Sequence, residues 1–191
     1  MFDVDLAVEL ASELSGDLEN FMMFALQALR EDYDPSVHNE GKAVEDAQAF
    51  YDAGQGKWGT DEKGFFTVLC TLPPEYMKMV DQVYASKHGY TMEKAVKKEL
   101  GGKVEDAAVH AIGMVLKPYD TIAIAFEKCM KGMGTDELGL SNCMVRYHHV
   151  LPQVMEAYEK MYEKTLRDRI HGETSGKYRD LLLAMIRSAV A

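Results

Sequence analysis

Apolar side chains recur along the chain at intervals of three and four residues, the spacing of one face of an α-helix. One such stripe lies in residues 76–84 and a second in residues 104–115, and matching stripes follow in residues 154–162 and 178–186. The members are Tyr76, Met79, Val80, Val83 and Tyr84; Val104, Ala108, Ala111, Ile112 and Val115; Val154, Tyr158, Met161 and Tyr162; and Tyr178, Leu181, Leu182, Met185 and Ile186. No segment alternates apolar and polar residues between hairpin turns, so the pattern predicts an all-α fold.

Two short motifs repeat along the chain. Gly59-Thr60-Asp61-Glu62 returns as Gly134-Thr135-Asp136-Glu137. A second motif occurs as Glu13-Leu14-Ser15-Gly16, Glu99-Leu100-Gly101-Gly102 and Glu173-Thr174-Ser175-Gly176. The offset from Gly59 to Gly134 is nearly the same as the offset from Glu99 to Glu173. Near-equal offsets indicate repeated structural units.

The repeats divide the chain into four segments. Residues 1–30 contain only the second motif, which predicts the last two helices of a partial repeat. Residues 31–44 are polar and form a predicted linker, and residues 45–117 and 118–191 each carry both motifs. We therefore expect two complete repeats of about five short helices each.

Helix-capping and helix-breaking residues support this division. Thr60, Thr91 and Thr135 are predicted N-caps, because a threonine hydroxyl can accept a hydrogen bond from a free N–H of the first turn. Pro73-Pro74 interrupts one helical segment, and Pro118 separates the two complete repeats.

The charge of the chain limits its partners. The formal net charge at pH 7 is −10, which argues against nucleic-acid binding and against a polybasic membrane attachment. An acidic chain meets an anionic bilayer most simply through a bridging divalent cation. No apolar run approaches the roughly 20 residues of a spanning helix, and the first residues lack a basic signal-peptide start, so we expect a cytoplasmic protein.

Glycine-rich loops coincide with distant carboxylates in both complete repeats. Ca²⁺ binds six to eight oxygen atoms, mainly from backbone carbonyls and a bidentate carboxylate. The glycines of residues 130–135 permit a turn that directs several carbonyls to one point, and Glu173 lies downstream of Gly134. Residues 54–60 form the corresponding loop, and Glu99 follows Gly59 at nearly the same spacing. The near-equal spacing predicts two calcium sites.

These motifs resemble those of the annexin family, whose calcium loops read K-G-x-G-T-D with an acidic residue about forty positions downstream before T-S-G or L-S-G. Lys131–Asp136 with Glu173–Gly176 is similar to the fourth annexin repeat, and Lys57–Glu62 is similar to the third. Glu13–Gly16 matches the end of the second repeat. The resemblance covers nearly the whole chain and corresponds to the C-terminal half of an annexin.

The resemblance implies a set of site residues. The principal calcium ligands would be Gly54, Lys57, Gly59 and Glu99 in the first complete repeat, and Met130, Gly132, Gly134 and Glu173 in the second. Additional, more weakly bound ions would lie at Thr60 with Glu62 and at Thr135 with Glu137. Trp58 and Met133 at the loop tips would contact lipid, flanked by Lys57 and Lys131.

The implied function is calcium-dependent, reversible binding to acidic phospholipid membranes by a cytoplasmic protein that is peripheral on the membrane when calcium is raised. Sites with a single carboxylate should bind calcium weakly in solution, on the order of 10⁻⁴ to 10⁻³ M. A chain that contains half an annexin leaves apolar surface exposed, so we also expect self-association.

Other interpretations of the same residues remain open. A Gly-Thr-Asp-Glu motif alone is often only a helix cap, which leaves a protein-interaction scaffold without calcium function. His148-His149 near Cys143 suggests a zinc site, or a hydrolase or peroxidase, although no coherent catalytic set accompanies it, and we predict no enzyme. Gly54–Lys57 only partly resembles a phosphate-binding loop, because Tyr51 and Trp58 occupy two of its key positions.

Overall fold

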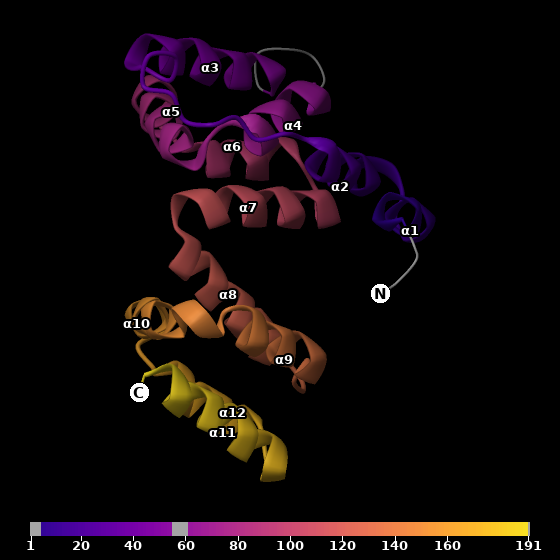
Figure 1. Cartoon of the computed structure of the whole chain (residues 1–191), viewed down its shortest axis with the longest axis vertical. Coiled ribbons are helices and arrows are strands. Elements are labelled where there is room, and N and C mark those ends of the chain that lie inside the picture. The colour runs from indigo at the N-terminus through magenta and orange to yellow at the C-terminus, as the bar shows by residue number, and fades with distance from the viewer. Residues whose placement is uncertain (1–4, 55–60, 191) are drawn as a thin grey trace. The chain divides into compact units, whose positions relative to one another are not determined.

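The computed structural model describes residues 5–54 and 61–190, and within these residues it contains α-helices, one 3₁₀ helix and no strand. The prediction of an all-α fold is confirmed. The chain divides into two compact units, residues 1–116 and residues 117–191. In Figure 1 the helices of the first unit run from indigo to pink, and those of the second unit run on through orange to yellow. None of the described helices combines the length and the apolar character needed to cross a bilayer.

The described residues of the first unit form seven helices. The first two precede a polar connection, and the other five follow it. The helices are α1 (Leu6–Glu13), α2 (Gly16–Gln27), α3 (Glu40–Ala53), α4 (Glu62–Thr71), α5 (Pro74–His88), α6 (Met92–Glu99) and α7 (Gly102–Leu116). Helix α3 begins inside the predicted linker 31–44, because the side chain of Asn39 accepts a hydrogen bond from Lys42 N and caps the helix there.

Local sequence explains where several helices begin and end. Pro74 stands in the first turn of α5, where its missing N–H costs nothing, and Gly89 ends the helix in the left-handed conformation at φ +79°. The hydroxyl of Thr91 accepts a hydrogen bond from Lys94 N, so Thr91 caps α6 as predicted.

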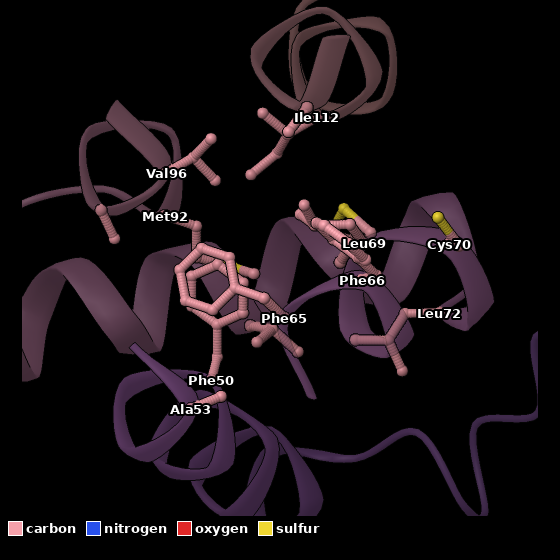
Figure 2. Close-up of a cluster of buried hydrophobic side chains, with 14 of the residues drawn as sticks. Phe50, Ala53, Phe65, Phe66, Leu69, Cys70, Leu72, Met92, Val96 and Ile112 are labelled. Atoms are coloured by element: carbon pink, nitrogen blue, oxygen red, sulfur yellow. The ribbon is translucent and has the colours of Figure 1, made fainter. Parts of the chain in front are cut away.

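The core of the first unit lies between α3, α4, α6 and α7, with α5 against α3 (Figure 2). Phe50 of α3 stacks on Phe65 of α4 with ring centroids 4.1 Å apart, and Tyr84 of α5 meets Phe50 edge-on at 5.6 Å. Met92 and Val96 cover these rings from α6, and both are fully buried. The face of α3 and α4 nearest the glycine loop is therefore fixed by aromatic packing.

The second unit consists of five α-helices and a single 3₁₀ turn within its described residues. These are α8 (Pro118–Met130), α9 (Glu137–Arg146), the 3₁₀ helix η1 (His148–Val150), α10 (Leu151–Tyr162), α11 (Leu166–Glu173) and α12 (Gly176–Ala189). Helix α8 packs on α9, α10 and α11, and α12 packs on α9, α10, α11 and η1. The expectation of about five helices in each complete repeat is confirmed.

Two members of the predicted apolar stripes do not face the core. Met161 is 40% exposed and Leu181 is 58% exposed. The buried face of α10 is centred on Val154, Ala157 and Tyr158, and that of α12 on Leu182, Leu183 and Ile186. Because successive helical residues differ in direction by about 100°, Met161 and Leu181 fall at the edges of these faces.

Candidate metal sites

The loop after α8 has the turn geometry that the sequence predicts. Residues 131–134 form bends, and Gly132 and Gly134 adopt positive φ angles of +107° and +92°. A side chain at either position would be strained, which explains why both are glycine. A hydrogen bond of 2.8 Å from Asp136 N to Cys129 O closes the loop at its base.

The N-cap of the helix that follows is Asp136, and the prediction that Thr135 caps it is wrong. The carboxylate of Asp136 accepts a hydrogen bond of 2.9 Å from Gly139 N. The hydroxyl of Thr135 instead donates to Glu173 O at 3.1 Å. Both residue types can cap, and here the aspartate lies at the position from which it reaches the third amide of the helix. Thr135 consequently connects the loop to the end of α11.

The predicted ligands Met130 and Glu173 converge on one cation, the guanidinium of Arg169. Its Nη2 donates to Met130 O at 2.6 Å, and its Nη1 donates to the Glu173 carboxylate. Arg169 and Glu173 are separated by one turn of α11, so their side chains lie on the same face. The structure therefore brings a loop carbonyl and the distant carboxylate to a single positive charge.

Glu127 holds the other side of the guanidinium. Arg169 Nε and Nη2 donate to the two Glu127 carboxylate oxygens, each at 3.1 Å, and Tyr158 donates to the same carboxylate. Burial raises the pKa of Glu127, but the hydrogen bonds from Arg169 and Tyr158 outweigh it, and the pKa lies below its ordinary value. Hydrogen bonding to Glu127 likewise raises the pKa of Arg169. Neither Glu127 nor Arg169 was among the site residues predicted from the sequence.

The loop of the first unit shows the same closure. Asp61 N donates to Ala53 O at 2.6 Å, and Asp61, not Thr60 as predicted, caps α4 by accepting from Gly64 N at 3.0 Å. Gly54 thus follows the closing carbonyl as Met130 does in the second unit. A β-carbon on Gly54 would stand 3.1 Å from Cγ of Glu99, so the Glu99 side chain lies against the Gly54 backbone.

The remaining predicted residues of this loop, Lys57, Trp58, Gly59 and Thr60, lie outside the described residues.

Gly54 offers a first test of the packing beneath this loop. In Gly54→Ala the new β-carbon would lie 2.7 Å from Cε2 of Phe65, which is held by its stack on Phe50. We expect the substitution to lower the free energy of unfolding by about 1–3 kcal/mol, as overpacking does. Gly101→Ala is the matched control, because nothing lies within 4 Å of its β-carbon. Thermal unfolding by circular dichroism measures both, and equal midpoints would contradict the expectation.

The other predicted site residues lie at the loops but differ in their surroundings. Met133 is fully exposed, with a relative accessibility of 107%, and Lys131 beside it is also exposed. Glu137 O accepts hydrogen bonds from the hydroxyls of Ser141 and Tyr178, which fix the start of α9.

Glu62 begins α4 in the first unit and faces another acid. Burial raises its pKa, and the neighbouring Asp17 raises it further. Within residues 5–54 and 61–190, no three His, Cys, Asp or Glu side chains gather into a group that could hold a metal ion. The ligand sets predicted for these loops combine backbone carbonyls with one carboxylate each.

His148, considered for zinc or for catalysis, has structural contacts. Its Nε2 lies 3.0 Å from Met185 O and 3.0 Å from the hydroxyl of Ser188. These contacts join the 3₁₀ turn to α12.

Comparison with known proteins identifies the class to which this fold and these loops correspond. The family model described as Annexin matches residues 45–111 and 122–185. The chain belongs to the annexin family. Annexins as a class are calcium-dependent membrane-binding proteins and not enzymes.

Individual relatives agree in sequence and in structure. The chain is 32% identical over 186 residues to annexin A5 of Cynops pyrrhogaster and 34% identical over 187 residues to annexin A13 of Mus musculus. These matches cover 96% and 97% of this chain but 57% and 58% of the relatives. The solved structure of annexin III aligns with a TM-score of 0.87 at 30% identity, covering 96% of this chain and 56% of that one. Chicken annexin V aligns with a TM-score of 0.84 at 28% identity, covering 96% and 58%. The chain thus spans less than two thirds of the length of these relatives.

Proposed function

We propose that the chain binds Ca²⁺ at the two glycine loops and uses the bound ions to attach reversibly to acidic phospholipid membranes. The proposed principal ligands are Gly54, Lys57, Gly59 and Glu99 in the first unit, and Met130, Gly132, Gly134 and Glu173 in the second. Weaker sites are proposed at Thr60 with Glu62 and at Thr135 with Glu137. Family membership supports the proposal in general terms, and the geometry of the second loop supports it for this chain.

The observation that carries the proposal is the convergence of Met130 O and the Glu173 carboxylate on one positive charge. Both are oxygen ligands of the kind that Ca²⁺ prefers, one a neutral carbonyl and the other an anion. The hydrogen bond from Thr135 to Glu173 O holds the loop and the end of α11 together. Met130 and Glu173 therefore match a calcium ion in donor type, and their contact with one cation supports the proposal.

The surface of the second loop also suits a membrane. Met133 presents an apolar side chain to solvent at the loop tip, and Lys131 supplies a positive charge next to it. An apolar tip beside a basic side chain matches the boundary between lipid headgroups and acyl chains. A bound calcium ion would supply a divalent charge with coordination positions for lipid phosphate oxygens. Trp58 is proposed to act in the first loop as Met133 does in the second.

Co-sedimentation with vesicles tests the proposal. We expect the protein to pellet with vesicles of phosphatidylserine and phosphatidylcholine in calcium, to return to the supernatant on addition of a chelator, and to ignore vesicles of phosphatidylcholine alone. Two loops on one chain should strengthen attachment well beyond either alone, by roughly 10²-fold or more if both engage the same vesicle. Equal pelleting in calcium and in chelator would contradict the proposal, and absence of pelleting in both would favour the scaffold interpretation.

A further inference from the structure

The guanidinium of Arg169 contacts two of the oxygen groups proposed as calcium ligands of the second loop. It contacts Met130 O through Nη2 and the Glu173 carboxylate through Nη1. We propose that Arg169 is a tethered cation that competes with calcium for these two oxygens, so that calcium enters the second loop only by displacing it. This inference rests on the proposed function, because it concerns regulation of the same site.

Steric and electrostatic reasons make the two cations exclude each other. Arg169 Nη2 is 2.6 Å from Met130 O, whereas Ca²⁺ requires its oxygen ligands at about 2.3–2.6 Å. A calcium ion bound to both oxygen groups would therefore lie within a few ångströms of the guanidinium, and two positive centres at such separation repel each other strongly in a mostly buried site. The Arg169 and Glu173 side chains are 21% and 26% exposed, so water screens this repulsion only in part.

Glu127 gives the displaced guanidinium a place to remain. It accepts from Nε and Nη2 of Arg169 at 3.1 Å each, and Tyr158 hydrogen-bonds to the same carboxylate. Calcium entry would therefore break the contacts of Arg169 with Met130 and Glu173. Because Nη2 contacts both Met130 O and Glu127, the hydrogen bond from Nε is the contact with Glu127 that can persist. A retained charge-assisted pair keeps the cost of displacement moderate, so the arginine weakens calcium binding without preventing it.

The two units differ at the positions involved. Ala95 precedes Glu99 by one helical turn, as Arg169 precedes Glu173. Tyr51 stands two positions before the loop-closing residue Ala53, as Glu127 stands before Cys129. The first unit thus has an uncharged Ala95 and Tyr51 where the second has Arg169 and Glu127. The Arg169–Glu127 pair therefore has no counterpart at these two positions of the first unit.

The expected gain in calcium affinity depends on the fraction of molecules in which Arg169 occupies the two oxygens. If Arg169 holds the two oxygens in about nine molecules of ten, the apparent dissociation constant for calcium is about tenfold higher than the intrinsic one. Removing the charge should recover most of that factor. We therefore expect Arg169→Gln to bind calcium in the second loop about five- to tenfold more tightly than the unchanged chain.

The experiment measures calcium binding to the second loop alone by titration calorimetry of the full chain. Glu99→Gln is introduced first to silence the first loop, and Arg169→Gln is compared with Arg169 in that background. Arg167→Gln is the matched control, because Arg167 lies on the same helix, is 53% exposed and pairs only with the neighbouring Asp168 at 3.4 Å among the described residues. Addition of Glu173→Gln identifies the signal that belongs to the second loop.

A second variant guards against loss of fold when Glu127 loses its partner. Glu127→Tyr with Arg169→Ala transfers the residues of the first unit, Tyr51 and Ala95, into the second. Thermal unfolding adds an independent readout: calcium should raise the melting temperature of both Arg169 variants more than it raises that of the Glu99→Gln background. If Arg169 served only to hold the structure, its removal would instead lower the calcium affinity, because Glu173 would lose its orientation.

The outcomes separate the inference from the function on which it rests. Tighter binding in both Arg169 variants, with no comparable gain in Arg167→Gln, supports the inference. Unchanged or weaker binding, with a signal that still disappears in Glu173→Gln, overturns the inference and leaves the proposed function standing. An equal gain in Arg167→Gln also overturns it, because net charge alone would then explain the effect. No calcium binding in any variant overturns both.

Discussion

Replacing Glu99 and Glu173 together by glutamine is expected to abolish calcium-dependent sedimentation with acidic vesicles. Each proposed site contains one carboxylate, and the change to an amide removes the only full negative charge and one strong oxygen ligand. Because both loops are proposed to engage the same membrane, their losses should multiply. We expect the calcium needed for half-maximal pelleting to rise by more than about 100-fold, beyond any practical concentration.

Control substitutions distinguish loss of a site from loss of charge. Glu75→Gln with Glu159→Gln changes the net charge by the same amount at exposed positions on α5 and α10. Helix content by circular dichroism should match that of the unchanged chain for both double variants. Retained pelleting in the Glu99 and Glu173 double variant, or equal loss in the control, would refute the assignment of these residues.

The regular parts of the fold could be predicted because they depend on repeated local signals. The stripe in residues 76–84 recurs every three to four positions, and Tyr76, Val80 and Tyr84 are fully buried as that period requires. Stripe edges are harder to predict: Leu181 satisfies the same spacing but is exposed, because its neighbours Leu182 and Leu183 take the buried positions. Periodicity identifies the helix, and packing decides which edge residues are covered.

Helix caps and loop closure depend on register, which the sequence leaves ambiguous. Thr135 and Asp136 are both good caps by residue type. The structure selects Asp136 because its carboxylate reaches Gly139 N, which leaves the Thr135 hydroxyl to bind Glu173 O. The contact between positions 135 and 173 joins the loop to the end of α11, which is far away in the sequence, and no local pattern predicts it.

The Glu127–Arg169 pair was missed for a different reason, because it appears in only one of the two repeats. The loop of the first unit is one residue longer: Asp61 bonds to Ala53, eight positions back, whereas Asp136 bonds to Cys129, seven back. Aligned by the Gly-Thr-Asp motif alone, the residues before the loop fall out of register. When the extra residue is allowed for, Glu127 aligns with Tyr51 and Arg169 aligns with Ala95. The second repeat therefore carries an acid and a base where the first repeat carries a tyrosine and an alanine.

Truncating Phe50 in the first unit is expected to cause the largest loss of stability among single substitutions considered for this chain. Phe50 is fully buried, stacks on Phe65 at 4.1 Å and meets Tyr84 at 5.6 Å. Phe50→Ala removes the ring from both contacts and leaves a cavity, which should lower the free energy of unfolding by about 3–5 kcal/mol. Because single domains have only about 5–15 kcal/mol in total, chemical denaturation should show a large shift of the midpoint.

Phe50→Ala should also affect the proposed calcium site of the first loop, through the packing beneath that loop. Phe65 lies directly beneath Gly54, where even a β-carbon would come within 2.7 Å of its ring. When Phe50 is lost, Phe65 is free to move away from Gly54, and calcium affinity of the first loop should fall while that of the second is unchanged. Leu29→Ala is the control, because Leu29 is 88% exposed and its truncation should alter stability by no more than about 0.5 kcal/mol. Similar midpoints for the two variants would show that the aromatic stack does not stabilise the first unit.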